Sequence, residues 1–292
     1  MHTILGSTGI RRAARLGAIA VVAAWSVGFA VGDAPAAPLH NAATIAERSG
    51  QAGEDFHWSW RIPAGKAIEI EGVNGAIHAV ATSGERVEVS ARKHARRSDP
   101  GKVAIEVLEH EGGVTLCVRY PDSRWGPHNV CAPNGKSHMS THDNDVQVDF
   151  EVRVPAGVRF VARTVNGGVD VETLDGPVEA RTVNGSIAVS TRRLAVASTV
   201  NGSIRAAFGS TSWDEPLEFT TVNGSITLDL SAHTDADVQA GTVNGGIETD
   251  FPITVQGRFN HRHLEGRIGK GGPRLELSTV NGSIRLRMAK ES

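Results

Sequence analysis

The sequence predicts an all-β protein: a right-handed parallel β-solenoid, or β-helix-like repeat array, preceded by a β-rich N-terminal section. Three observations support this fold class. A six-residue unit recurs along the chain, most copies stand about 20 residues apart, and no long stretch beyond the N-terminus has helical periodicity. Val and Thr, which favour extended backbone, occur throughout.

The recurring unit is Thr-Val-Asn-Gly-Ser-Ile. Its Thr-Val pair is β-branched and favours a strand, and Ser-Ile can begin the next strand. Asn-Gly between them can turn the chain, because both residues tolerate positive φ. The asparagines that we predict to be the structural repeat residues are Asn74, Asn166, Asn184, Asn201, Asn223, Asn244 and Asn281.

Two structures could use this unit. Each copy could be the tip of a β-hairpin, because Asn-Gly between extended runs is typical of hairpin turns. Alternatively, each copy is one corner of a solenoid, with Asn stacked on Asn from coil to coil. From Asn166 the steps are 18, 17, 22, 21 and 37 residues, which favours the solenoid with one altered copy within residues 259–268. In this interpretation Asn281 lies in the last coil and has one neighbour.

The first 37 residues read as a signal peptide, with an uncleaved membrane anchor as the alternative. Arg11, Arg12 and Arg15 precede an uncharged apolar run from Leu16 to Val31, and small residues follow. The apolar run is short for a membrane span. We therefore expect an exported protein in the periplasm, the cell envelope or the medium, with no stable membrane span after cleavage. Residues 38–53 are expected to be a linker.

The remaining chain divides into a β-rich N-terminal section, 54–157, and the repeat array, 158–290, which we expect to form one continuous fold. Arg61–Gly65 is repeated as Arg153–Gly157, with Val in place of Ile, at an offset of 92 residues. The same offset relates Asn74 to Asn166, so a unit of strand, Pro-Ala-Gly turn, strand and Asn-Gly occurs twice.

Cys117 and Cys131 are the only cysteines in the sequence. In an exported protein, this pair is expected to form a disulfide that closes the Pro-, Gly- and His-rich loop between them. Two free thiols or two metal ligands are the alternative.

These motifs resemble the bacterial putative-adhesin family of unknown function. The resemblance rests on the recurrent Val-Asn-Gly-Ser-Ile, the strand that ends in Pro-Ala-Gly, and the closing segment Ile268–Ile284. It spans about residues 55–290. It implies a repetitive β fold in an exported or envelope protein, and it carries over no catalytic residue.

Composition and side-chain chemistry indicate a protein that is not an enzyme. A net charge of −2 argues against a nucleic-acid partner. Asp170, Glu172 and Asp175 could be catalytic carboxylates, but solvated strand positions explain them equally. The loop His138–Asp145 could hold a metal, but it lacks the Gly and Glu of a calcium loop. We therefore predict no catalytic, cofactor-binding or metal-binding residues.

The function predicted from the sequence is a cell-envelope scaffold or adhesin-like binding surface. Its partner is expected to be an unidentified protein or glycan. The alternative is a carbohydrate-active β-helix enzyme, either a polysaccharide lyase or a hydrolase. A groove lined by paired acids and aromatic residues would favour the enzyme, and a flat face of Thr, Ser and Arg would favour the scaffold.

Overall fold

The structure of the chain is a computed structural model that describes residues 55–289, except 125, 210–212, 214 and 256–259. The predicted signal peptide, 1–37, and linker, 38–53, lie outside the described residues. In the described ranges, no helix has the length and apolarity needed to cross a membrane.

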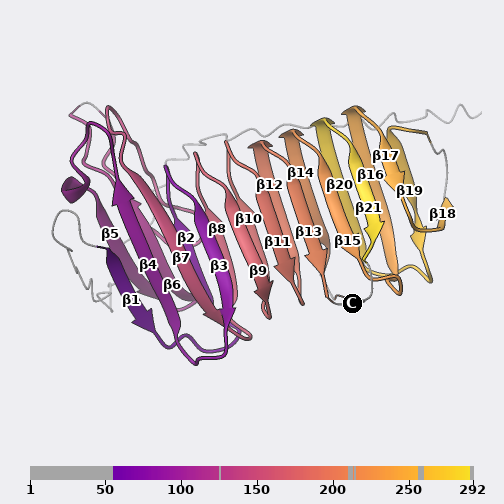
Figure 1. Ribbon diagram of the computed structural model, residues 1–292, viewed down its shortest axis with the longest axis horizontal. Coiled ribbons are helices and arrows are strands. Elements are labelled where there is room, and N and C mark those ends of the chain that lie inside the picture. The colour runs from indigo at the N-terminus through magenta and orange to yellow at the C-terminus, as the bar shows by residue number, and fades with distance from the viewer. Residues whose placement is uncertain (1–54, 125, 210–212, 214, 256–259, 290–292) are drawn as a thin grey trace, which may run out of the picture. The chain divides into compact units, whose positions relative to one another are not determined.

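Two β-sheets account for nearly all regular structure (Figure 1). The ten-stranded sheet contains, in spatial order, β1 (Phe56–Trp60), β4 (Val87–His94), β7 (Gln147–Pro155), β3 (Ile77–Thr82), β9 (Val169–Leu174), β11 (Ile187–Thr191), β13 (Ile204–Phe208), β15 (Ile226–Leu230), β21 (Ile284–Met288) and β17 (Ile247–Thr249). The eleven-stranded sheet contains β18 (Ile253–Val255), β19 (His263–Ile268), β16 (Ala236–Asn244), β20 (Arg274–Asn281), β14 (Leu217–Asn223), β12 (Ala195–Asn201), β10 (Val178–Arg181), β8 (Arg159–Arg163), β2 (Ala67–Glu71), β6 (Gly113–Arg119) and β5 (Ala104–His110). The helical element in the described residues is the 3₁₀ turn η1 (Pro100–Lys102).

Each copy of the repeat joins one strand of the eleven-stranded sheet to one strand of the ten-stranded sheet. The strand pairs of these coils are β2–β3, β8–β9, β10–β11, β12–β13, β14–β15, β16–β17 and β20–β21. Neighbouring coils pair in parallel and in register, so that Thr199 faces Thr221 and Ile204 faces Ile226. Parallel pairing confirms the predicted all-β solenoid and excludes the hairpin array, whose strands would pair antiparallel.

The spatial order of the coils differs from their order in the sequence. The last coil, β20–β21, lies between β14–β15 and β16–β17, as Figure 1 shows for β20. Asn281 therefore has a neighbour on both sides, and the prediction that it ends the stack is wrong. The described residues 260–268 do not form the altered coil that was expected within 259–268. Their strand β19 instead pairs antiparallel with β16, and the step of 37 residues reflects this insertion.

The 92-residue offset has a direct structural counterpart. Strand β2 pairs with β8 so that Ile68 lies beside Phe160, and Asn74 bridges to Asn166. Parallel pairing thus continues from the first copy of the duplicated unit into the second. Antiparallel strands flank this stack, with β4 against β7 and β5 against β6.

The core is built by alternation along the strands. Residues at every second position face inward, as in β12, where Ala195, Ala197 and Thr199 are buried and the residues between them are half-buried. The inward apolar side chains of both sheets form one hydrophobic cluster. Side chains with polar chemistry therefore lie on the outer faces, at the corners and in the loops.

Candidate functional site

The repeat requires Gly because the backbones of adjacent coils lie too close at this position to admit a side chain. A Cβ built on Gly185, Gly202 or Gly224 would lie about 2 Å from the carbonyl oxygen of the equivalent Gly in the adjacent coil. Positive φ was the predicted reason for Asn-Gly, and this reason is wrong for the repeat: apart from Gly75, none of its Asn or Gly residues has positive φ.

Threonine of the repeat is buried and bonds to the same carbonyl. Thr182 Oγ1 donates to Gly167 O at 2.8 Å, and Thr221 Oγ1 donates to Gly202 O at 2.8 Å. Equivalent bonds occur at Thr164, Thr199, Thr242 and Thr279. Burial of this hydroxyl is offset by its hydrogen bond, so Thr closes each corner from the inside.

Asparagine of the repeat forms a continuous amide ladder. Each Nδ2 donates to the Oδ1 of an adjacent coil at 2.8 Å, in the spatial order Asn74, Asn166, Asn184, Asn201, Asn223, Asn281 and Asn244. Six of these side chains are exposed and Asn74 is half-buried. The ladder therefore borders the solvent along one corner of the stack.

Next to the ladder, the outer side of the eleven-stranded sheet carries neutral rows. Ser198, Thr220 and Ser278 lie side by side in register. A second row, formed by Val200, Val222 and Val280, lies two residues later in each strand. The side chains of both rows are half-buried. We call this surface the Ser/Thr–Val face, and its residues are Ser198, Thr220, Ser278, Val200, Val222 and Val280. Arg163 and Arg181 continue the hydroxyl row toward the N-terminal section.

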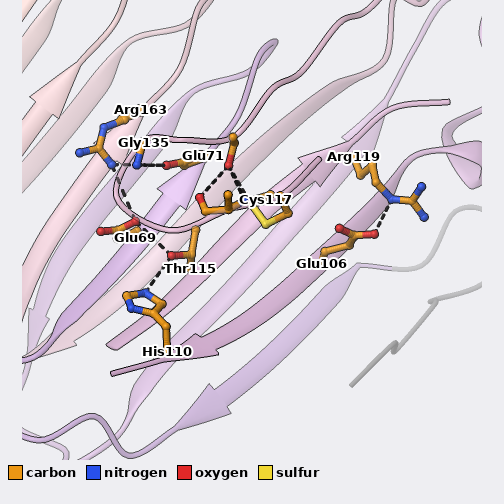
Figure 2. Close-up of a disulfide and its surroundings, with 12 residues drawn as sticks. Glu69, Glu71, Glu106, His110, Thr115, Cys117, Arg119, Gly135 and Arg163 are labelled. Carbon is orange, nitrogen blue, oxygen red and sulfur yellow. Dashed lines mark hydrogen bonds and ion pairs between the residues drawn. A yellow bond between two sulfur atoms is a disulfide. The ribbon is translucent and has the colours of Figure 1, made fainter. Parts of the chain in front are cut away.

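A buried ionic cluster lies farther along the same side of this sheet, beneath the loop between β6 and β7 (Figure 2). Glu69 and Glu71 are 4% and 6% exposed. Arg163 Nη1 lies 3.4 Å from Glu71 Oε1, and its Nη2 lies 2.7 Å from Glu179 Oε1. Since Glu71 and Arg163 are 92 residues apart, opposite charges at the repeat offset were a sequence signal for this cluster that sequence reasoning missed.

Hydrogen bonds and a disulfide hold the loop between β6 and β7 against this cluster. Asn134 N donates to Glu69 Oε2 at 2.9 Å, and Gly135 N donates to Glu71 Oε1 at 3.1 Å. A disulfide joins Cys117 of β6 to Cys131 of the loop, with a Cα–Cα distance of 5.8 Å. The carboxylates and the disulfide together hold the loop against the sheet.

Two of the three carboxyl groups that contact Arg163, those of Glu71 and Glu179, have opposite pKa shifts. Burial raises the pKa of Glu71 above its usual value, although Arg163 opposes this shift. Burial also acts to raise the pKa of Glu179, but Arg163 and Arg181 outweigh it and the net pKa is lowered. The arrangement fits a structural ion-pair network. Arg163 is shared by Glu69, Glu71 and Glu179, and the loop covers Glu69 and Glu71.

The three carboxylates that were candidates for catalysis do not form one site. Asp170 and Glu172 lie exposed on the outer side of β9. Asp175 lies in the turn after β9, where its Oδ1 is 3.4 Å from Arg193 Nε. The structure brings His78 of β3 beside Asp170 instead, through the pairing of β3 with β9.

The loop His138–Asp145 uses its polar groups for local structure. The carboxylate of Asp145 accepts hydrogen bonds from the backbone N–H groups of Arg96, Arg97 and Ser98, which lower its pKa to about 2, with Ser98 contributing most. In the described part of the chain, the group of side chains placed to share a metal is His78, Asp170 and Glu172, and it includes no residue of this loop.

Two clefts of the described surface are lined by residues outside the Ser/Thr–Val face. One, of about 840 Å³, is lined by β1 and its neighbours, including Trp58, Trp60 and Glu151. The other, of about 670 Å³, is lined by turn residues such as Asp175 and Arg193 and by Arg159, Glu179 and Val196 of strands β8, β10 and β12. Asp170 and Glu172 line neither of these two clefts, but the first cleft combines Trp58 and Trp60 with Glu88, Glu109 and Glu151, which is the combination of aromatic residues and acids that the enzyme alternative expects.

Comparisons with known proteins identify the repeat region. Residues 159–287 match the model of the Toastrack DUF4097 family. A search of curated proteins finds no match.

Solved structures with a similar chain include a putative cell adhesion protein from Clostridium sporogenes, with 10% identity and a TM-score of 0.45 over 80% of this chain and all of that one. A putative adhesin from Bacteroides fragilis has 12% identity and a TM-score of 0.34, over 80% of this chain and 97% of that one. A putative lipid binding protein from Parabacteroides distasonis has 13% identity and a TM-score of 0.27 over the same shares.

Proposed function

The chain carries a Toastrack DUF4097 domain at residues 159–287, and on this premise we propose that it is an exported, non-enzymatic protein with an adhesin-like binding surface. The binding surface in this proposal is the Ser/Thr–Val face together with the Asn ladder beside it. Its partner is an extended glycan of the cell surface or its surroundings.

The observation that supports this proposal is the regular chemistry of the two uncharged rows of the face, which are bordered on the side away from the ladder by Glu218 and Glu276. Hydroxyl groups of Ser198, Thr220 and Ser278 repeat at the spacing of the strands, about 4.8 Å, and the valine row runs parallel to them. A repeating polymer can place its hydroxyl groups on the first row and its apolar ring faces on the second. Each contact is weak, but the repetition adds them along the polymer.

Two further observations are consistent with a role outside the cytoplasm. The disulfide between Cys117 and Cys131 is of a kind that persists in oxidising compartments. The N-terminal sequence has the pattern of a signal peptide. N-terminal sequencing of the exported protein should find a start near residue 38, whereas a retained Met1 would contradict cleavage.

The binding test compares two threonines of one coil on opposite outer faces. The mature chain, residues 38–292, is applied to a glycan array and to a pull-down of cell-surface material. Thr220→Tyr places a ring on the Ser/Thr–Val face and should abolish binding. Thr227→Tyr is the control, because Thr227 is also half-buried but lies on the ten-stranded sheet.

Each outcome of this test separates the candidate functions. Loss of glycan binding in Thr220→Tyr alone supports the proposed face. Equal loss in both variants, or binding of a protein and no glycan, contradicts it. Release of new sugar ends from a bound polysaccharide would favour the enzyme alternative, and Asp170→Asn would then be the variant to examine.

A further inference from the structure

Three side chains that can bind metal meet on the outer side of the ten-stranded sheet, away from the Ser/Thr–Val face. His78 on β3 lies in register with Asp170 on β9, and Glu172 follows on the same side of β9. One nitrogen or oxygen atom from each lies within 4.8 Å of the other two. His78 Nδ1 and Asp170 Oδ2 are 4.0 Å apart.

The local charge favours a cation at this position. Glu151 lies directly across from His78 on the other neighbouring strand, so three acids surround one imidazole. Within the described chain, neither Asp170 nor Glu172 has an ion pair with Arg or Lys, whereas nearby Arg153 lies 3.8 Å from Glu88. Asp170 and Glu172 lie two residues apart on the same side of β9, and a bound cation would relieve the repulsion between their carboxylates.

We propose that His78, Asp170 and Glu172 bind one divalent first-row transition metal ion such as Zn²⁺. Imidazole and carboxylate together suit Zn²⁺ better than they suit Ca²⁺ or Mg²⁺, which prefer oxygen ligands alone. Zn–N and Zn–O bonds of about 2.1 Å place two tetrahedral ligand atoms about 3.4 Å apart. The side chains of His78 and Asp170 are 39% and 58% exposed, so they are free to close the remaining gap, and water completes the coordination.

The ligands come from two coils that are distant in sequence. His78 belongs to the coil of Asn74, and Asp170 and Glu172 belong to the coil of Asn166. A metal ion at this position therefore links the first copy of the duplicated unit to the second. Since such an ion binds the folded chain, it should raise the melting temperature, by about 5 °C at a concentration of about 100 times its Kd.

The test uses the mature chain, residues 38–292, treated with EDTA and dialysed. Titration calorimetry with ZnCl₂ is expected to show one site. His78→Ala and Asp170→Asn should each weaken binding at least about tenfold and remove the rise in melting temperature. Circular dichroism of each variant shows whether it retains the β fold; His78 is half-buried and Asp170 is exposed.

The chain offers a matched control in a His–Asp pair outside this triad. His94 Nδ1 lies 3.6 Å from Asp149 Oδ2, with similar exposure, and no third ligand in the described residues completes a group there. His94→Ala should leave zinc binding unchanged. Equal weakening by His94→Ala and His78→Ala, or no binding by the unaltered protein, would overturn the proposal.

Discussion

The dipeptide Asn-Gly occurs eight times in the chain, and two regions use it for different reasons. In the disulfide-linked loop, Asn134 and Gly135 both have positive φ, 61° and 70°, and the pair makes a tight turn. In the repeat, Gly is present because the next coil leaves no room for a side chain, and Asn is present because it bonds to its copies. The same two letters thus encode a local turn in one region and contact between coils in the other.

The largest expected effect tests this difference at glycine. In Gly202→Ala the new Cβ would lie 2.0 Å from Gly185 O, so the backbone of two coils must move. We expect a loss of about 3 kcal/mol or more in the free energy of unfolding, measured by denaturant titration. In Gly135→Ala the positive φ should cost only about 1–2 kcal/mol.

A glycine without neighbours gives the control for this pair. Nothing lies within 4 Å of a Cβ built on Gly241 in β16, so Gly241→Ala should be neutral within about 0.5 kcal/mol. If Gly202→Ala were as mild as Gly241→Ala, contact between coils would not be the reason for the repeat glycine.

The disulfide is the next test, because it acts on the loop and not on the array. Replacing Cys117 and Cys131 together by Ser opens a loop closed over 14 residues and should lower the free energy of unfolding by about 3 kcal/mol. Mass spectrometry of a non-reduced digest should first show the linked peptides. Two separately alkylatable thiols in protein from an oxidising compartment would contradict the bond.

A smaller effect is expected at the buried threonine of the corner. Thr221→Val keeps the shape of the side chain but removes the donor to Gly202 O, and should cost about 1 kcal/mol. Thr220→Val, one residue earlier on the half-buried outer side, should change the stability by less than about 0.5 kcal/mol. Equal effects of the two changes would show that the hydroxyl bond between coils contributes nothing.

The smallest effect is expected at the end of the exposed Asn ladder, at Asn244. Asn201 has a ladder bond on each side, whereas Asn244 has one, to Asn281. Asn201→Ala should cost about 1 kcal/mol and Asn244→Ala about half of that. A peptide map of aged protein should show faster deamidation at Asn244 than at Asn281, and the reverse order would contradict the inserted position of the last coil.

The solenoid could be predicted from the sequence because its signal is repetition. Seven copies of the same unit, most of them about one coil length apart, indicate that identical corners stack on one another. The offset of 92 residues correctly relates β2 to β8. The order of the coils could not be predicted, because every corner carries nearly the same residues. A corner that fits any other corner contains no information about which one is its neighbour.

The candidate sites were less accessible to sequence reasoning. Glu172 was noted for its spacing from Asp170, but His78 joins them only through pairing across 92 residues. The Ser/Thr–Val face is built from two side chains in each of three coils, so no local window of the sequence contains it. Aligning the repeat copies and comparing equivalent positions would have found both the metal triad and the Ser/Thr–Val face.

The insertion of β20–β21 between earlier coils makes the order of synthesis differ from the order in space. While the chain is being made, β14 has only β12 as a neighbour and β16 has only β19. Both strands lack their second neighbour until β20 has been added. The coils up to β15 can form as they are made, but the far end of the stack can close only after β20 and β21 have been added.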